Sequence, residues 1–401
     1  MLTKTCLNPI ARPAPTADSF AFPAGPDAAV QVLRTIADWP HYARTPLLAL
    51  PGLARSLECG AIHYKQEAPR FGLGSFKALG GAYAVQRVLA AIVAQRTGQV
   101  PDSQDLFSGR HADIAGSVTV CCATDGNHGR SVAWGAAQFG CQCVIYIHQA
   151  VSQARADAIA ALGATVRRLP GNYDDAVRFA QQDAAIHGWH VVSDTSYPGY
   201  AEIPGWIMQG YSVIAEEIRA QLGDVRPTHV FLQAGVGGFA AAIMSSMAQA
   251  YAEAPPRFIV VEPDHAACLL ASAQAGSRVT VGGELDTIMA GLACGEPSEI
   301  AWPAIHALAD AYLAIDDESV RETMRLLAAG VDGDAPVVAG ESGAAGLAGL
   351  REVMGRPEIA DTLGLDATSI VVAIGTEGAT DAALYHAIVG RTPEEVAADA
   401  R

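Results

Sequence analysis

The chain has 401 residues, a length that predicts two domains. Half of the residues are hydrophobic and 17% are charged, which favours a soluble globular protein. The formal charge of −16 disfavours nucleic acid and anionic membranes as partners. The sequence lacks a run of roughly 18 uninterrupted apolar residues and an apolar signal segment near its start, so we expect a cytoplasmic protein with no membrane partner.

The predicted elements alternate between strands and helices from about residue 117 onward. Before that point we expect an Ala- and Pro-rich arm at 1–40, an Ala-rich helix that starts near Lys77, and a polar surface loop at 97–116. The predicted strands are 117–122, 142–147, 165–169, 189–193, 228–233, 257–261, 311–315 and 369–374. The predicted helices between them are 128–139, 152–162, 172–187, 237–251, 316–329 and 341–354. This alternation predicts an α/β fold with open, mainly parallel twisted sheets and helices on both faces.

Ligands of such folds bind beyond the carboxyl ends of the strands, so the turns that follow strands are the places to search. The stretch R-F-G-L-G-S-F-K-A-L-G-G, 70–81, surrounds Lys77 with Phe71, Phe76 and Leu79. Apolar neighbours remove water from a lysine and lower its pKa, which favours the free amine that a Schiff base requires. The alternative is a helix lysine whose stem lies on an apolar surface while its ammonium stays in water.

A second turn, A-T-D-G-N-H-G, follows the predicted strand 117–122 and leads into a helix. Backbone N–H groups at such a turn point at an anion, with the helix dipole behind them. The Asn127 side chain can donate to a ring oxygen. Asp125 suits a helix N-cap as well as a functional role, because Asp is common at N-caps.

The third turn is Q-A-G-V-G-G-F, after the predicted strand 228–233. Glycines let the backbone approach a phosphate closely. The residues expected to hold that phosphate are Gly235, Val236, Gly237 and Gly238. Gly235, Gly237 and Ala240 also fit the dinucleotide pattern G-x-G-x-x-A, with Glu262 at the end of the next strand for a ribose hydroxyl. A nicotinamide enzyme is therefore the alternative for this stretch.

The last predicted strand ends in G-T-E-G, where Thr376 brings a hydroxyl to the carboxyl edge of the sheet, or simply caps a helix. Together these four features suit pyridoxal phosphate. Lys77 would form the imine, Asn127 would bind the phenolic oxygen, the glycine turn would bind the phosphate, and Thr376 would face the ring nitrogen. A dinucleotide site leaves Lys77 and the Asn127 turn without a role.

In this order, S-F-K, D-G-N-H-G, G-V-G-G and G-T-E-G resemble the fold-type II pyridoxal-phosphate enzymes, which are related to threonine dehydratase and have a tryptophan synthase β-like fold. More closely, the chain resembles the diaminopropionate ammonia-lyase family. This likeness rests on R-F-G-L-G-S-F-K-A-L-G-G, T-D-G-N-H-G-R-S-V-A-W, V-E-P-D, I-M-A-G-L-A-C-G and G-E-S-G-A-A-G-L, and above all on S-D-T-S-Y-P-G-Y-A-E-I-P-G-W-I-M-Q-G-Y at 193–211. It covers most of the chain from about 64 to 381.

The resemblance implies an imine at Lys77 and α,β-elimination of ammonia from 2,3-diaminopropionate, D or L or both, which gives pyruvate and two ammonia. It also implies a homodimer, a large cofactor domain formed by 1–88 and 192–401, and a small domain at 89–191. Three alternatives stay open: a serine or threonine dehydratase, a lyase for another β-substituted alanine, and a non-catalytic amino-acid-binding protein on the same fold.

The acid at position 125 distinguishes this family from dehydratases, which usually carry serine there. We expect Asp125 to lie across the substrate from Lys77, so that Lys77 takes the Cα proton of the L form and Asp125 that of the D form. Asp194 is expected to hold the distal ammonium of the substrate, the alternative being a turn or cap residue. Tyr197 and Trp206 either close that pocket or serve plain packing. The candidate catalytic residues are Lys77, Asp125 and Asp194. The candidate substrate-binding residues are Ser75, Thr124, Asp125, His128, Asp194 and Tyr197.

Two further expectations concern the cysteines and a long loop. Cys141-x-Cys143 has no second Cys or His pair to complete a zinc site, so we predict no metal and mostly buried, reduced thiols. Residues 276–303 are glycine-rich and poorly periodic, and a loop of that length predicts a mobile cover over the site.

Overall fold

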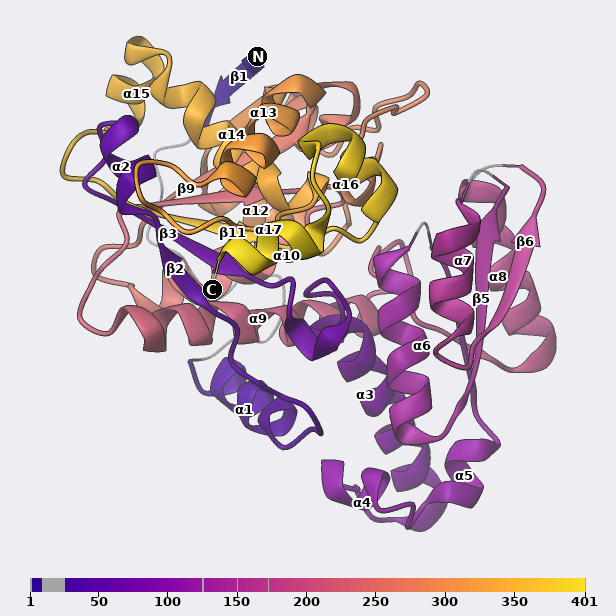
Figure 1. Cartoon of the computed structure of the whole chain (residues 1–401). Coiled ribbons are helices and arrows are strands. Elements are labelled where there is room, and N and C mark those ends of the chain that lie inside the picture. The colour runs from indigo at the N-terminus through magenta and orange to yellow at the C-terminus, as the bar shows by residue number, and fades with distance from the viewer. Residues whose placement is uncertain (1, 9–25, 125, 150, 172, 401) are drawn as a thin grey trace. The chain divides into compact units, whose positions relative to one another are not determined.

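The computed structural model describes residues 2–8, 26–124, 126–149, 151–171 and 173–400. The chain divides into two compact units, each of which is an α/β structure (Figure 1). The larger unit comprises Met1–Ala29, Arg44–Ser75 and Ile214–Arg401, and the smaller unit comprises Val30–Ala43 and Phe76–Val213. The smaller unit thus contains the whole range 89–191.

The larger unit is built on a seven-stranded sheet in the described residues, with the order β1-β10-β9-β8-β11-β3-β2. Its strands are β1 (Leu2–Leu7), β2 (Leu47–Ala49), β3 (Ala61–Gln66), β8 (His229–Gln233), β9 (Arg257–Pro263), β10 (Ala309–Ile315) and β11 (Ile370–Gly375). The five central strands are parallel, and β1 and β2 pair antiparallel at the two edges. The predicted strands from 228 onward are confirmed as β8 to β11.

Helix α14 (Glu341–Met354) covers one face of the large sheet, and α13 (Asp317–Ala329) packs against it (Figure 1). The glycine spacing of α14 explains how closely it approaches the strands. A Cβ atom at Gly346 would lie 3.0 Å from the Phe231 carbonyl oxygen, and one at Gly349 would lie 2.6 Å from Val261. The remaining helices of this unit are α2 (Pro51–Ser56), α10 (Gly238–Ala250), α11 (Cys268–Ala275), α12 (Trp302–Leu308), α15 (Pro357–Leu363), α16 (Ala382–Val389) and α17 (Pro393–Asp399), with 3-10 turns at Arg70–Gly72, Asp264–Ala266 and Ala290–Leu292.

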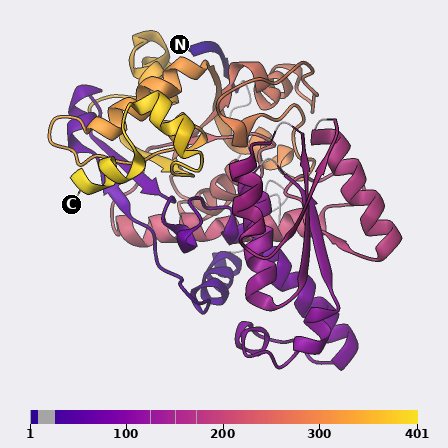
Figure 2. The same cartoon turned by 45° about the vertical axis from the view of Figure 1, so that its right-hand side comes forward.

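The smaller unit contains a parallel four-stranded sheet with the order β6-β5-β4-β7 in the described residues. Its elements are α3 (Ala78–Thr97), α4 (Ser103–Phe107), α5 (Ala112–Gly116), β4 (Thr119–Ala123), α6 (Asn127–Phe139), β5 (Gln142–His148), α7 (Gln153–Ala160), β6 (Thr165–Leu169), α8 (Tyr173–His187) and β7 (His190–Val191). Val144 and Tyr146 pack against α8, whereas Ile145 lies where a Cβ at Gly129 of α6 would touch it. Helices α6 and α8 therefore cover opposite faces of this sheet (Figure 2).

Two segments differ from the sequence-based expectation. Residues 97–116 contain the short helices α4 and α5, with buried Leu106 and Ala115, rather than a surface loop. Part of the predicted arm forms α1 (Pro26–Ala37), and the division between the units falls within α1 and within α9 (Glu202–Leu222). Polar residues obscured the short helices at 97–116, whereas the Ala- and Pro-rich composition of the N-terminal region obscured α1.

Helix α3 is, in the described part of the chain, the one helix long and apolar enough to cross a membrane by length and composition. However, 67% of its most apolar stretch is buried inside the protein, which is the pattern of a core helix. All eight cysteines are free thiols, and the described residues contain no cluster of three or more His, Cys, Asp or Glu side chains suited to a metal ion.

Candidate active site residues

Lys77 is the residue directly before α3, in the smaller unit. The sequence contains lysine at only three positions, and Lys4 is exposed on the edge strand β1. The Lys77 side chain is 20% exposed, and its ammonium lies 5.5 Å from the ring centre of Phe76 and 5.8 Å from that of Tyr211. Of the predicted apolar neighbours, Phe76 lies beside the Lys77 ammonium, and Tyr211 on α9 was not predicted because it lies far along the chain.

The sequence around Lys77 allows α3 to pack tightly on its neighbours. A Cβ at Gly80 would lie 2.5 Å from the Tyr211 ring, and one at Gly81 would lie 2.0 Å from the Ser131 hydroxyl of α6. Gly210 of α9 likewise faces the Leu79 carbonyl oxygen, 1.9 Å from where its Cβ would be. The A-L-G-G stretch therefore serves helix packing, which fixes the first turn of α3 and the lysine before it.

Asp194 is the carboxylate that pairs with this lysine. It follows β7, and its Oδ2 lies 2.6 Å from Lys77 Nζ and 3.7 Å from His128 Nδ1. Burial by itself would raise the pKa of Asp194, but the positive charge beside it outweighs burial and holds the pKa well below its usual range. His128 and Lys77 both contribute to the lowered pKa of Asp194, while burial lowers the pKa of His128 itself, which favours the neutral imidazole. The structure brings together three of the predicted site residues: Lys77, Asp194 and His128.

The turn before α6 is organised by Thr124. Its hydroxyl oxygen accepts hydrogen bonds from the N–H groups of Gly126 and Gly129, each at 3.0 Å. Thr124 thus caps the first turn of α6, the task that the sequence also offered to Asp125. Asp125 itself lies outside the described residues. Asn127 is the first residue of α6, which places its amide at the carboxyl end of β4 as predicted.

Tyr197 is half-buried and stacks on Tyr200, with ring centres 4.9 Å apart. The Tyr200 hydroxyl accepts from the Ser193 N–H at 2.9 Å and donates to the Val191 carbonyl at 2.8 Å. Tyr200, which follows Asp194, thus holds Val191 and Ser193, which precede it. Trp206 lies under the guanidinium of Arg87, 5.0 Å from its centre, so part of its ring serves packing within this unit.

In the larger unit, the glycine turn joins β8 to α10. Gly237 has a φ of +97°, and a Cβ there would lie 2.5 Å from Ile305. A Cβ at Gly235 would lie 3.0 Å from the Cys294 sulfur. The N-cap residue of α10 is Gly237, which has no side chain, and the dipole at the start of this helix favours an anion. These features fit a phosphate group held by backbone.

Thr376, at the carboxyl end of β11, is buried at 4% exposure. Its oxygen accepts a 2.9 Å hydrogen bond from Gln233 Nε2 on the neighbouring strand β8. Because Gln233 uses the oxygen as an acceptor, the hydroxyl proton remains available to donate. A proton-donating hydroxyl suits an unprotonated ring nitrogen. Gln233 was missed by the sequence analysis, since only strand pairing reveals that it faces Thr376.

Ser75 also belongs to the larger unit and is almost fully buried, at 2% exposure. It forms an isolated β-bridge with Glu377, the residue after Thr376, and the Gly378 N–H donates to the Gly74 carbonyl at 2.9 Å. Ser75 is therefore held against the strand end that carries Thr376.

Glu262 decides against the dinucleotide alternative. It is completely buried, and its two carboxylate oxygens accept from the N–H groups of Leu269 and Leu270, each at 2.8 Å. Burial raises the pKa of this carboxyl to about 8. Both oxygens are occupied in capping α11, so Glu262 cannot serve a ribose.

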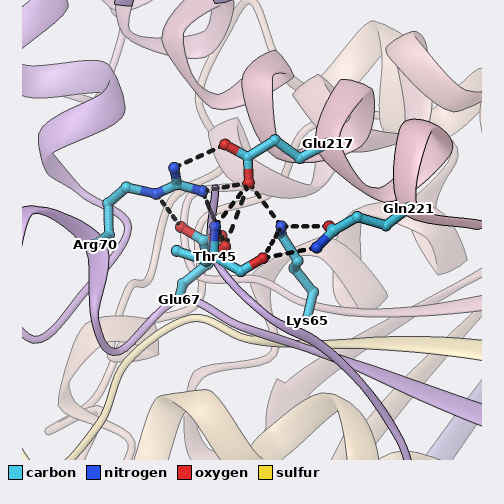
Figure 3. A network of polar contacts seen from close by, with 6 residues as sticks. All are labelled: Thr45, Lys65, Glu67, Arg70, Glu217 and Gln221. Carbon is cyan, nitrogen blue, oxygen red and sulfur yellow. Dashed lines mark hydrogen bonds and ion pairs between the residues drawn. The ribbon is translucent and has the colours of Figure 1, made fainter. Parts of the chain in front are cut away.

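A buried network of charged groups lies at the end of β3 in the larger unit (Figure 3). Its members are Thr45, Lys65, Glu67, Arg70, Glu217 and Gln221. Lys65 Nζ donates to Glu217 at 2.6 Å, to Gln221 at 2.8 Å and to the Thr45 carbonyl at 2.8 Å, which uses all its donors. Arg70 forks onto both glutamates, and the charged side chains have no exposed surface. Lys65 is therefore committed to structure, which leaves Lys77 as the lysine suited to covalent chemistry.

A family described as pyridoxal-phosphate dependent enzyme matches residues 39–362. Diaminopropionate ammonia-lyase of Escherichia coli strain K12 is 41% identical over 362 residues, which are 89% of this chain and 89% of that protein. The Salmonella typhimurium enzyme of the same name is 43% identical over 363 residues, 87% of this chain and 89% of that one. The chain belongs to the diaminopropionate ammonia-lyase family of pyridoxal-phosphate dependent enzymes.

Solved structures agree with this assignment. The E. coli diaminopropionate ammonia-lyase in complex with D-serine has a TM-score of 0.87 at 37% identity, covering 96% of each chain. The same enzyme with an aminoacrylate–PLP azomethine reaction intermediate has a TM-score of 0.87 at 36% identity, covering 97% of each chain. The predicted fold class, the pyridoxal-phosphate cofactor and the enzyme class, a PLP-dependent ammonia-lyase, are confirmed.

Proposed function

We propose that this protein eliminates ammonia from 2,3-diaminopropionate, in the D form, the L form or both, and so gives pyruvate and two ammonia. The observation that carries the proposal is the anionic Asp194 beside Lys77. A lysine that is joined to the cofactor no longer offers its ammonium to Asp194, and a buried carboxylate left alone is unfavourable. The distal ammonium of diaminopropionate would restore that charge balance, whereas serine or threonine offers only a hydroxyl.

Pyridoxal phosphate supplies an electron sink that acidifies the Cα–H bond of the bound amino acid. We assign its carbonyl carbon to Lys77, its phosphate to the backbone of Gly235, Val236, Gly237 and Gly238, its phenolic oxygen to Asn127 and its ring nitrogen to the Thr376 hydroxyl. The Thr376 oxygen already accepts from Gln233, which supports a donating hydroxyl and a neutral ring nitrogen. The assigned cofactor domain, 1–88 and 192–401, stays a prediction.

Lys77 is assigned as the base for the L form and Asp125 as the base for the D form, with Asp194 as the group that binds the distal ammonium. Ser75, Thr124, His128 and Tyr197 complete the proposed substrate contacts. Thr124 keeps its hydroxyl proton for such a contact, because its two described hydrogen bonds use only the oxygen as an acceptor.

A homodimer in the cytoplasm is part of the same proposal. The eight free thiols suit a reducing compartment. The dimer follows from the family resemblance, and light scattering on the purified protein tests it.

The test uses borohydride, which fixes a lysine-bound cofactor irreversibly. Purified protein loaded with pyridoxal phosphate should show a visible absorbance band that borohydride bleaches, with the label on Lys77 by mass spectrometry. Lys77→Ala should lose both the band and pyruvate production, and Lys4→Ala, at an exposed lysine, should keep both. Label on Lys4 or Lys65, or full activity of Lys77→Ala, would contradict the assignment. Turnover of D- and L-serine above that of diaminopropionate would favour the dehydratase alternative.

A further inference from the structure

His128 is a buried group beside the Lys77–Asp194 pair, and the proposed chemistry gives it no proton to handle. It lies on α6, is 7% exposed, and its Nδ1 is 3.7 Å from Asp194 Oδ2. That nitrogen makes no hydrogen bond with the described residues. A buried, unpartnered ring nitrogen aimed at a charged pair calls for a chemical reason.

The other ring nitrogen fixes the tautomer. His128 Nε2 lies 2.8 Å from the Val192 carbonyl oxygen, which can only accept, so Nε2 carries the hydrogen. The neutral ring therefore presents a bare lone pair at Nδ1 to the Asp194 carboxylate. That arrangement is tolerated because the Lys77 ammonium lies 2.6 Å from the same carboxylate oxygen. One added proton at Nδ1 would turn the contact into an attraction.

Lys77, in contrast, must lose a proton before it can react. Its ammonium has no lone pair, so it must release a proton before its nitrogen can attack a carbonyl carbon. The short contact with Asp194 stabilises the ammonium and opposes that release. A base within reach of the pair would remove the obstacle, and Asp194 Oδ2 lies between Lys77 Nζ and His128 Nδ1.

We propose that His128 is a positioning residue that accepts at Nδ1, through Asp194 Oδ2, the proton that Lys77 Nζ releases before it attacks the cofactor carbonyl. One N–H bond at Lys77 breaks and one N–H bond at His128 forms, so the three side chains stay neutral in sum. Protonated His128 then holds Asp194 until the distal ammonium of a ligand takes that place, when His128 returns its added proton to solvent. This inference rests on the proposed role of Lys77 as the cofactor lysine.

Asp194 after β7 and Lys77 before α3 are the charged groups that act on His128; Tyr211 on α9 and Cys122 on β4 act in turn on Asp194. Burial raises the pKa of Cys122 and of Tyr211, so both stay protonated at neutral pH. Burial lowers the pKa of His128 and the Lys77 charge lowers it further, while Asp194 raises it. The positive charge on Lys77 is lost when the ammonium releases its proton, and this loss should raise the pKa of His128.

Nitrogen NMR of the histidine rings in the full-length protein without cofactor measures this directly. His128→Gln identifies the signal, and Lys77→Met removes the ammonium. Lys77→Met should raise the pKa of His128 by about one unit or more, since an opposite charge then acts alone on the ring. The pair Lys77→Met with Asp194→Asn should abolish that rise. An unchanged or lowered pKa in Lys77→Met would overturn the proposal.

Loading of the apoprotein with pyridoxal phosphate gives a second readout. His128→Gln should form the visible band at least about tenfold more slowly near pH 7. This loss is smaller than the roughly 10²–10⁴-fold of a general base, because solvent also accepts the Lys77 proton. The rate should approach that of the wild type at high pH, where solvent removes the Lys77 proton. His190→Gln, at a half-buried histidine on β7 of the same unit, is the matched control and should load normally. Equal loading by His128→Gln at pH 7 would refute the relay. A band that survives in Lys77→Met would instead refute the lysine assignment itself.

Discussion

Asp194 contacts two other candidate site residues of the smaller unit, and its negative charge favours a cationic partner. Lys77 is that partner at 2.6 Å, and His128 lies within 3.7 Å. A buried carboxylate without a cation is strongly destabilising, so the group favours a ligand that carries a second ammonium. This requirement separates a diamino acid from a hydroxy amino acid by charge rather than by size.

Asp125→Asn tests the proposed division of labour between the two bases. The hydroxyl of Thr124 already caps the first turn of α6, so the change should remove charge with little loss of helix stability. We expect kcat/KM for D-2,3-diaminopropionate to fall by about 10²–10⁴-fold, the usual contribution of a general base. The L isomer should lose far less, because Lys77 serves it.

Pyruvate formation from each isomer measures the effect. Asp194→Asn is the informative comparison. It should raise KM for both isomers, because the variant lacks the carboxylate that binds the distal ammonium. Small and equal losses on both isomers in Asp125→Asn would leave Asp125 with a structural role only.

At the level of elements, the sequence predicted those strands that consist of β-branched or apolar runs, such as β8 and β11. It missed β3, since A-I-H-Y-K-Q carries polar residues inside the sheet. Lys65 is buried there beside Glu217, which lies 152 positions away in the sequence and neutralises its charge. The motifs identified Lys77 and Asp194 separately. Their ion pair could not be predicted from the sequence, because the two residues are 117 positions apart. Local patterns predict elements, whereas pairings between distant residues depend on the tertiary fold.

The predicted cover at 276–303 divides in two by its contacts. Met289 is fully buried, Thr287 and Ile288 bond to Asp317, and the Ser298 N–H donates to the Val236 carbonyl at 2.8 Å. Residues 277–286 contain no helix or strand and are largely exposed. Any mobile cover is therefore expected in 277–286, while the later part supports the glycine turn.

Gly237→Ala tests that turn. Its φ of +97° disfavours any side chain, and the new Cβ would lie 2.5 Å from Ile305. The turn must then shift, so the dissociation constant for pyridoxal phosphate should rise at least about tenfold, roughly the loss of one good hydrogen bond to a charged group. Gly223→Ala is the control, because its φ of +60° carries a similar backbone strain with open space around the Cβ. Spectral titration with the cofactor should separate the two variants; equal affinities would contradict a phosphate role for this turn.

At the scale of the whole molecule, buried carboxylates of this acidic chain are paired with basic side chains. The formal charge is −16, yet Glu67 and Glu217 are completely buried against Lys65 and Arg70. Such pairs stabilise the fold only while both members are charged, because a partner left alone is a buried unpaired charge. Stability of the larger unit should therefore depend on pH well below neutrality.

Glu352 gives the clearest test of this dependence. Glu352, on α14, contacts three other parts of the larger unit. Its carboxylate lies 2.6 Å from Arg356 at the start of α15, accepts from the Ser319 hydroxyl of α13 at 2.7 Å, and accepts from the Leu2 N–H of β1 at 2.8 Å. Burial alone would raise the pKa of Glu352, but these three contacts lower it to about 2. Because the folded pKa lies below the unfolded value, the contribution is complete above the unfolded pKa, near 4.3, and is lost as pH falls toward 2.

Glu352→Gln should therefore lower the free energy of unfolding at pH 7 by about 1–2 kcal/mol, allowing for partial screening by solvent. The difference from wild type should shrink between about pH 4.5 and pH 2, where the wild-type carboxyl becomes protonated and neutral like the amide. Urea unfolding at pH 7, pH 4 and pH 2.5 measures this, with Glu253→Gln, at a side chain 90% exposed, as the control that should stay close to wild type throughout. A constant difference at all three pH values would show that Glu352 acts through packing and not through its charge.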